Sequence, residues 1–314
     1  MIRFLLLLFC CFISLNTEAQ NGEKWFKKGE SAYTEKQYLD AFYFFSKAIE
    51  SKYKPLEKAY LYRGSVSKAM GKYDDAISDY NQALELVPDM PEAYCNRANV
   101  RYLQKKYKEA TADYDKAIYL KNNFAEAYYN RGNVKFDLNK YYEASADYSK
   151  AIETKPDFAM AYYSRANVHL SLNNLDDAIV DYDHAEKLNL NTPELFFNRA
   201  DAKANLKQYT EAIIDYNKAT KMDPSFAEAF NNCGLSYHNL SKYKEAVEQY
   251  NLAIAADAAF PEAYNNRGLA KEQLRQYVDA NADFDKALAL DPNLSDALDN
   301  KQRVDMLAKL RNNK

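Results

Sequence analysis

The sequence predicts an all-helical solenoid, because three series of residues recur along it at one fixed spacing. Small residues stand 34 residues apart at seven successive places: Gly64, Ala98, Gly132, Ala166, Ala200, Gly234 and Gly268. A series of alanines keeps the same step from Ala76 to Ala280, and an aromatic series keeps it from Tyr80 to Phe284. A period of this length is typical of proteins that stack one supersecondary unit many times.

The first 19 residues differ from the repeats and predict a secretory signal peptide. Arg3 precedes an apolar run from Phe4 to Ile13, and Thr17-Glu18-Ala19 provides the small residues of a cleavage site after Ala19. The run is short for a membrane span. A signal anchor that stays on the chain is the alternative. We expect export to the periplasm or the extracellular space, with no transmembrane segment in the mature chain.

The periodic region, residues 20–294, divides into eight repeats of about 34 positions, numbered here so that Gly64 is at position 8. Position 4 is always aromatic, positions 20 and 27 are always alanine, and position 24 is Tyr or Phe. Apolar residues at helical spacing predict two amphipathic helices in each repeat, and the small residues allow them to approach closely. Proline at position 32 of four repeats ends the second helix. The repeats begin at Gly22, Glu57, Pro91, Ala125, Ala159, Pro193, Ala227 and Pro261.

This pattern resembles the tetratricopeptide repeat over residues 22–292. The resemblance implies a right-handed superhelical solenoid of helix–turn–helix repeats, in which the first helix of each pair lines a concave groove. It also implies a non-catalytic scaffold that binds a protein or peptide partner. Residues 295–314 predict a C-terminal capping helix and tail, with Ser295 as the N-cap and a charged surface that closes the solenoid.

Arginine at position 7 and aspartate at position 23 occur in the same six repeats. Repeat 1 has Lys28 and Phe44 at these positions, and repeat 7 has Cys233 and Gln249. Because both partners are lost together, we expect an ion pair that joins the two helices of a repeat. The predicted pairs are Arg63–Asp79, Arg97–Asp113, Arg131–Asp147, Arg165–Asp181, Arg199–Asp215 and Arg267–Asp283.

Amide side chains recur at positions 6 and 9, which tend to face the groove in the tetratricopeptide family. An amide can donate and accept hydrogen bonds, so a row of amides could hold an extended peptide backbone. Alternatively, these amides bond neighbouring helices or water. The candidate amides are Asn96, Asn130, Asn198, Asn232 and Asn266 at position 6, and Asn99, Asn133 and Asn167 at position 9.

Aromatic residues at positions 5 and 12 form a second candidate set, namely Tyr129, Phe136, Tyr163 and Phe197. Exposed aromatic residues that cluster in a concavity are typical of binding hot spots. The alternative is packing between adjacent helices. A separate aromatic run in repeat 1, residues 42–45, predicts either a docking or self-association surface or a larger local core.

Composition and motifs argue against several other functions. A net charge of −3 provides no basic surface for nucleic acid. The three histidines occupy unrelated repeat positions, and no phosphate loop or nucleophile motif is present, so we expect no metal, no cofactor and no catalytic site. Two functions stay open. The chain is a scaffold or adaptor that holds an extended peptide in its groove, or a structural subunit of an envelope or secretion assembly, bound through its outer face or first repeat.

Overall fold

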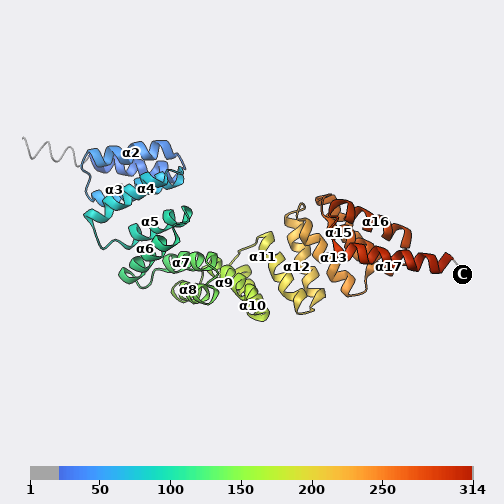
Figure 1. Cartoon of the computed structure of the whole chain (residues 1–314). Helices are drawn as coiled ribbons and strands as arrows, with labels where there is room; N and C mark the ends of the chain where they lie inside the picture. Colours follow the sequence, from blue (N-terminus) through green and yellow to red (C-terminus); the bar gives the residue numbers. More distant parts are fainter. Residues whose placement is uncertain (1–20, 313–314) are drawn as a thin grey trace, which may run out of the picture. The chain divides into compact units, whose positions relative to one another are not determined.

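The computed structural model describes residues 21–312, with side chains through residue 307, and every regular element in that range is a helix (Figure 1). The predicted signal peptide lies outside the described residues. A helix over residues 21–34 comes first, and α17 (Ser295–Asn312) comes last. This arrangement agrees with the predicted all-α solenoid.

Two helices form each repeat, and we call the first the A helix and the second the B helix. The A helices of repeats 2 to 8 are α3 (Leu56–Ala69), α5 (Pro91–Leu103), α7 (Ala125–Asp137), α9 (Ala159–Ser171), α11 (Pro193–Asn205), α13 (Ala227–Asn239) and α15 (Pro261–Gln273). The B helices of the eight repeats are α2 (Tyr38–Glu50), α4 (Tyr73–Leu86), α6 (Tyr107–Leu120), α8 (Tyr141–Thr154), α10 (Leu175–Lys187), α12 (Tyr209–Met222), α14 (Tyr243–Ala256) and α16 (Tyr277–Leu290).

The helix ends follow from local chemistry. The turn from an A helix to its B helix uses one residue with positive φ, such as Gly71 with φ of 74° in repeat 2. The B helix α4 ends in extended backbone at Val87, with φ of −134°, as expected for the residue before Pro88. The next A helix then begins after a short connection.

Close approach of the two helices depends on the small residue at position 8. A Cβ atom added to Gly132 of α7 would lie 2.7 Å from the ring of Tyr148 on α8. The ring at position 24 is buried in all eight repeats, with an exposure of 1% for Tyr148 and Tyr216 and 0% for the other six. The core of a repeat is therefore a tyrosine or phenylalanine ring set between alanines.

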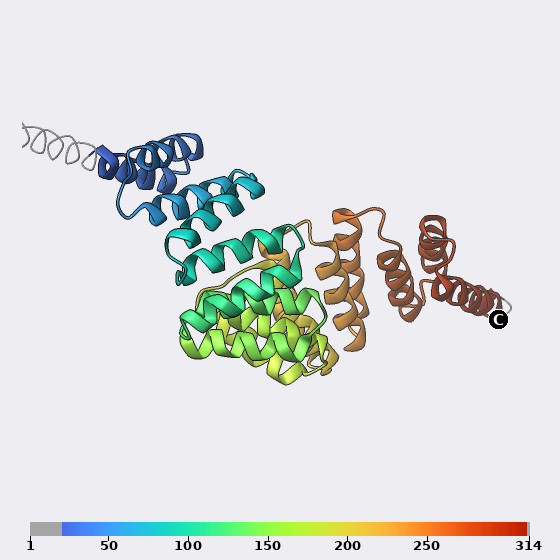
Figure 2. The same ribbon diagram turned by 60° about the vertical axis from the view of Figure 1, so that its left-hand side comes forward.

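The helices gather into two compact units, residues 1–156 and residues 157–314. In unit 1, α5 contacts α3 and α7 as well as α4 and α6, and in unit 2, α13 contacts α11 and α15 as well as α12 and α14. Figure 2 shows the same succession of paired helices from a second direction.

The predicted ion pair is confirmed in all six repeats. In repeat 4, Arg131 donates from Nε and Nη2 to the two oxygens of Asp147, at 2.8 and 2.6 Å. Its Nη1 also donates to Asp115 on α6 of the preceding repeat, at 2.6 Å. Lys135 approaches Asp147 to 2.9 Å. The arginine thus joins three helices, and the sequence predicted only the contact within the repeat.

The C-terminal helix packs as the A helix of a ninth repeat would. It buries Ala297 and Val304 against the end of unit 2. Asn300 donates to Asn265 at 2.9 Å, and Arg303 donates to both oxygens of Glu272 at 2.9 and 2.6 Å. These bonds continue the contacts that join successive repeats.

Candidate functional site

The predicted amides lie half-buried on the A helices and bond to one another between repeats. Asn130 donates from Nδ2 to Oδ1 of Asn99 at 2.9 Å. The same oxygen accepts the hydroxyl of Tyr114 at 2.6 Å. In unit 2, Asn198 donates to Oδ1 of Asn167 at 3.2 Å. The structure thus shows the bonds between neighbouring helices that were one of the two alternatives, and peptide binding by these amides stays a prediction.

The other amides follow the same rule with variations. Asn133 accepts the hydroxyl of Tyr148 at 2.8 Å. Asn232 donates to Asp201 at 3.1 Å, and Asn266 donates to Asn231 at 3.0 Å. Asn96 lies half-buried on α5. Most of the row therefore makes contacts between repeats, Asn133 bonds within its own repeat, and all of these side chains are still partly open to solvent.

The four predicted aromatic residues are also half-buried, and each packs on a B helix or on the loop that follows one. Three of them pack on the buried ring at position 24 and so cover the core of their own repeats. The ring centroids of Tyr129 and Tyr148 lie 5.8 Å apart, those of Tyr163 and Tyr182 5.9 Å, and those of Phe197 and Tyr216 6.0 Å. Phe136 instead packs on Tyr141 at 5.5 Å, and Phe197 also contacts Phe226 at 4.7 Å.

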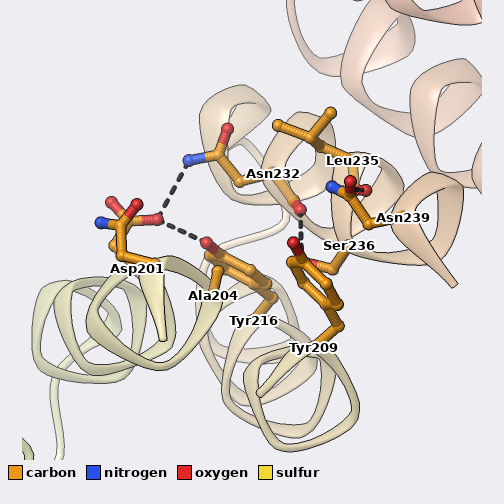
Figure 3. A pocket seen from close by; sticks show the side chains of 9 residues that line it. Asp201, Ala204, Tyr209, Tyr216, Asn232, Leu235, Ser236 and Asn239 are labelled. Carbon is orange, nitrogen blue, oxygen red and sulfur yellow. Dashed lines mark hydrogen bonds between the residues drawn. The ribbon is translucent and has the colours of Figure 1, made fainter. Parts of the chain in front are cut away.

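A pocket of about 340 Å³ opens in unit 2 among α11, α12 and α13 (Figure 3). Its lining residues from α11 and α13 occupy repeat positions 6, 9, 10, 12 and 13, which include the positions expected to face the groove. The lining residues are Asp201, Ala204, Asn205, Tyr209, Tyr216, Asn232, Leu235, Ser236 and Asn239.

The pocket exists because Ala204 stands at position 12. In repeat 3, Tyr102 at this position packs on the position-17 ring of Tyr107, with centroids 5.9 Å apart. The same contact joins Phe136 to Tyr141 in repeat 4. The methyl group of Ala204 cannot reach that far, so the ring of Tyr209 is left lining an open space.

Asp201 lines this pocket, and the sequence analysis did not single it out. It holds position 9, where the three preceding repeats have asparagine. Its Oδ1 accepts the hydroxyl of Tyr216 at 2.5 Å and the amide of Asn232 at 3.1 Å (Figure 3). Burial raises the pKa of the Asp201 carboxyl, and these two hydrogen bonds oppose that shift. The sequence did contain a signal for this pocket. In repeat 6, aspartate replaces the asparagine of position 9, and the small residue Ala204 stands at position 12.

Other functional chemistry is sparse in the described part of the chain. Residues 21–312 contain no cluster of His, Cys, Asp and Glu side chains suited to a metal ion. Nor does any helix among them combine the length and apolarity needed to cross a membrane. Cys95 and Cys233 are both buried, and burial raises the pKa of each thiol to about 12, so both stay protonated at neutral pH.

Comparison with known families agrees with the helix pairs. Models of the TPR repeat match residues 64–105, 98–139 and 201–241, and models of the tetratricopeptide repeat match residues 125–158, 159–192, 227–260 and 261–294. The chain belongs to the tetratricopeptide repeat (TPR) family. No curated protein sequence matches it.

Solved structures of other TPR proteins share the fold. YrrB, described as a TPR protein with an unusual peptide-binding site, is 25% identical with a TM-score of 0.56, over 60% of this chain and 97% of YrrB. The C-terminal part of a TPR protein from Cytophaga hutchinsonii is 19% identical with a TM-score of 0.64, over 76% of this chain and 97% of its own. MamA is 22% identical with a TM-score of 0.52, over 55% of this chain and 93% of its own.

Proposed function

We propose that this TPR protein is an exported, non-catalytic scaffold or adaptor that holds an extended peptide along the face formed by its A helices. The fold supports a role in protein–protein interaction, and the similar protein YrrB has a peptide-binding site. The observation that carries the proposal is the coincidence of the half-exposed amides and the unit 2 pocket at the same repeat positions.

The amides suit this task chemically. The bond from Asn130 to Asn99 uses one N–H of Asn130, whereas an amide offers two donors and an acceptor with two lone pairs. The inter-repeat bond therefore orients the side chain while it keeps capacity for a ligand. An oriented side chain loses less conformational entropy on binding than a free one.

Export rests on the signal peptide predicted for residues 1–19, which would place the chain in the periplasm or the extracellular space. The test is to express the full chain with its own N-terminus and to sequence the N-terminus of the mature product. A product that begins at residue 20 supports the proposal. An intact N-terminus on a membrane-attached chain would support the signal anchor instead.

Affinity capture from envelope extract tests the peptide-binding role, with the full chain as bait beside a variant that carries Asn130→Ala and Asn198→Ala. We expect this variant to lose its partner, because its A-helix face has lost two amides. The matched control carries Tyr114→Phe and Tyr182→Phe, which removes bonds to Asn99 and Asn167 from the buried side only. The control should keep the partner. Capture of the same partner by all three baits would place the interface elsewhere.

Repeat 1 favours the second candidate, a structural subunit that binds through its first repeat. Leu39 is 75% exposed and Tyr43 is 51% exposed on α2, beside the stacked rings of Trp25 and Phe44, whose centroids lie 5.7 Å apart. We expect Leu39→Glu with Tyr43→Glu to abolish assembly if this surface is the interface. Sedimentation analysis measures self-association directly, and an unchanged distribution would remove self-association through repeat 1.

A further inference from the structure

Asp201 carries a charge that its structural role does not require. In repeat 5, the neutral oxygen of Asn167 accepts bonds from Tyr182 and from Asn198 of the next repeat. Asp201 accepts the equivalent two bonds from Tyr216 and Asn232. Asparagine thus provides the same connection without the desolvation cost of a carboxylate. The charge therefore has to be explained by something other than the contact between repeats.

The charge is also without a counter-ion in the described structure. The interactions that shift the pKa of Asp201 include no lysine, arginine or histidine from the described residues. By contrast, Asp215 on the neighbouring B helix is held by both Arg199 and Lys203, at 2.7 and 2.6 Å. Among the residues that line the pocket, Asp201 is the one acidic residue, and none is lysine, arginine or histidine. The pocket is thus complementary to a cation.

The walls of the pocket suit a side chain with an aliphatic stem. Ala204 and Leu235 contribute apolar surface, and the ring of Tyr209 is left uncovered by the small residue at position 12. Asn239 supplies an exposed amide, whereas Ser236 is buried and its hydroxyl donates to the backbone oxygen of Asn232 at 2.9 Å. Lysine and arginine pack their methylene groups on apolar surface while the charged end seeks a partner.

We propose that this pocket binds the charged end of a lysine or arginine side chain of the bound peptide, with Asp201 as the counter-ion. The inference rests on the proposed function, because the pocket lies among the positions expected to hold the peptide. It adds a sequence preference to a surface whose amides would recognise only backbone. A carboxylate that accepts a charge-assisted bond in a partly buried site provides such a preference.

A displayed library of random peptides tests this inference on the full chain. Peptides of about 12 residues span roughly 40 Å when extended, which is longer than one repeat is wide. Three variants are selected in parallel. Asp201→Asn removes the charge, Ala204→Phe fills the pocket as Phe136 does in repeat 4, and Asn167→Asp places a carboxylate one repeat earlier, where Leu170 holds position 12.

We expect peptides enriched on the parent chain to share one lysine or arginine position. Replacing that residue by glutamine should weaken binding about tenfold on the parent chain, and by less than about twofold on Asp201→Asn and Ala204→Phe. On the Asn167→Asp chain, whatever its overall affinity, the same replacement should again weaken binding about tenfold. Asp201→Asn is expected to fold, because asparagine makes the same two bonds in repeats 3 and 5.

The outcomes separate the two proposals. If peptides bind but share no basic position, or if the loss on replacement with glutamine persists in Asp201→Asn, the pocket inference is wrong while peptide binding stands. If a basic preference depends equally on a carboxylate at residue 167, the pocket is not its source. If no peptide is enriched on any chain, the peptide-binding function fails and the pocket inference fails with it.

Discussion

The ion pairs of repeat 6 can be replaced by the uncharged residues that repeat 7 uses at the same positions. Arg199 is 3% exposed and donates to both oxygens of Asp215, at 2.8 and 2.7 Å. Its Nη1 also donates to Asp183 and Glu186 of the preceding repeat, both at 2.6 Å. Repeat 7 has Cys233 and Gln249 in place of the pair. The substitutions Arg199→Cys and Asp215→Gln therefore copy a combination that the fold already accepts.

The structure sets the expected magnitudes. Arg199→Cys leaves the carboxylate of Asp215, only 1% exposed, with Lys203 at 2.6 Å and Lys218 at 3.9 Å as its remaining cations. Breaking a buried pair costs about 3–5 kcal/mol, and Lys203 brings the expected cost to about 3 kcal/mol. Asp215→Gln should cost about 2 kcal/mol, because Arg199 keeps Asp183 and Glu186. The double variant should lose only about 3 kcal/mol, which is a coupling of about 2 kcal/mol.

Urea denaturation followed by circular dichroism measures these losses, and hydrogen exchange of α11 and α12 locates them, since repeat proteins open locally. The matched control is Arg63→Cys with Asp79→Gln. The side chain of Arg63 is 22% exposed, whereas that of Arg199 is 4% exposed. Its coupling should be smaller because solvent already screens the pair. Losses in repeat 6 that simply add, within about 0.5 kcal/mol, would refute the argument that the buried pair acts as a unit.

Three further predictions concern single contacts. Burial raises the folded-state pKa of Asp201, so the parent chain loses stability as the pH rises through that pKa. Asp201→Asn should therefore have a higher melting temperature than the parent at neutral pH. The difference between the two melting temperatures should disappear in acid. Equal melting temperatures at neutral pH would contradict this. Within the described residues the buried hydroxyl of Tyr250 has no hydrogen-bond partner, so Tyr250→Phe should leave the free energy of unfolding unchanged or raise it. Tyr114→Phe loses the bond to Asn99 and should lower the free energy of unfolding by about 1 kcal/mol, as measured by urea denaturation. Ending the chain after residue 294 removes the contact of Val304 with the last repeat. Amide hydrogen exchange should therefore accelerate in α16 more than in α12. Equal protection of the two helices from exchange would argue against a capping role for α17.

The candidate site was predictable only in part. The positions of the amides and aromatics on the A helices followed from the repeat, and the structure places all of them at half-buried sites. The direction of the amide bonds did not follow, because an amide can be turned either way in a helix. The pocket was missed because it depends on the absence of a large side chain at Ala204, and the sequence analysis looked for residues that are present.

The sequence by itself determined the helix pairs and the ion pair within six of the repeats. Both depend on contacts between residues close in the chain, such as Arg131 and Asp147, which are 16 apart and have counterparts in five other repeats. Only the tertiary structure decided that Arg131 also reaches Asp115, and that Asp201 lines an open pocket. These features depend on how adjacent repeats are stacked and how side chains turn in the space between them, and repeat spacing alone leaves that geometry open.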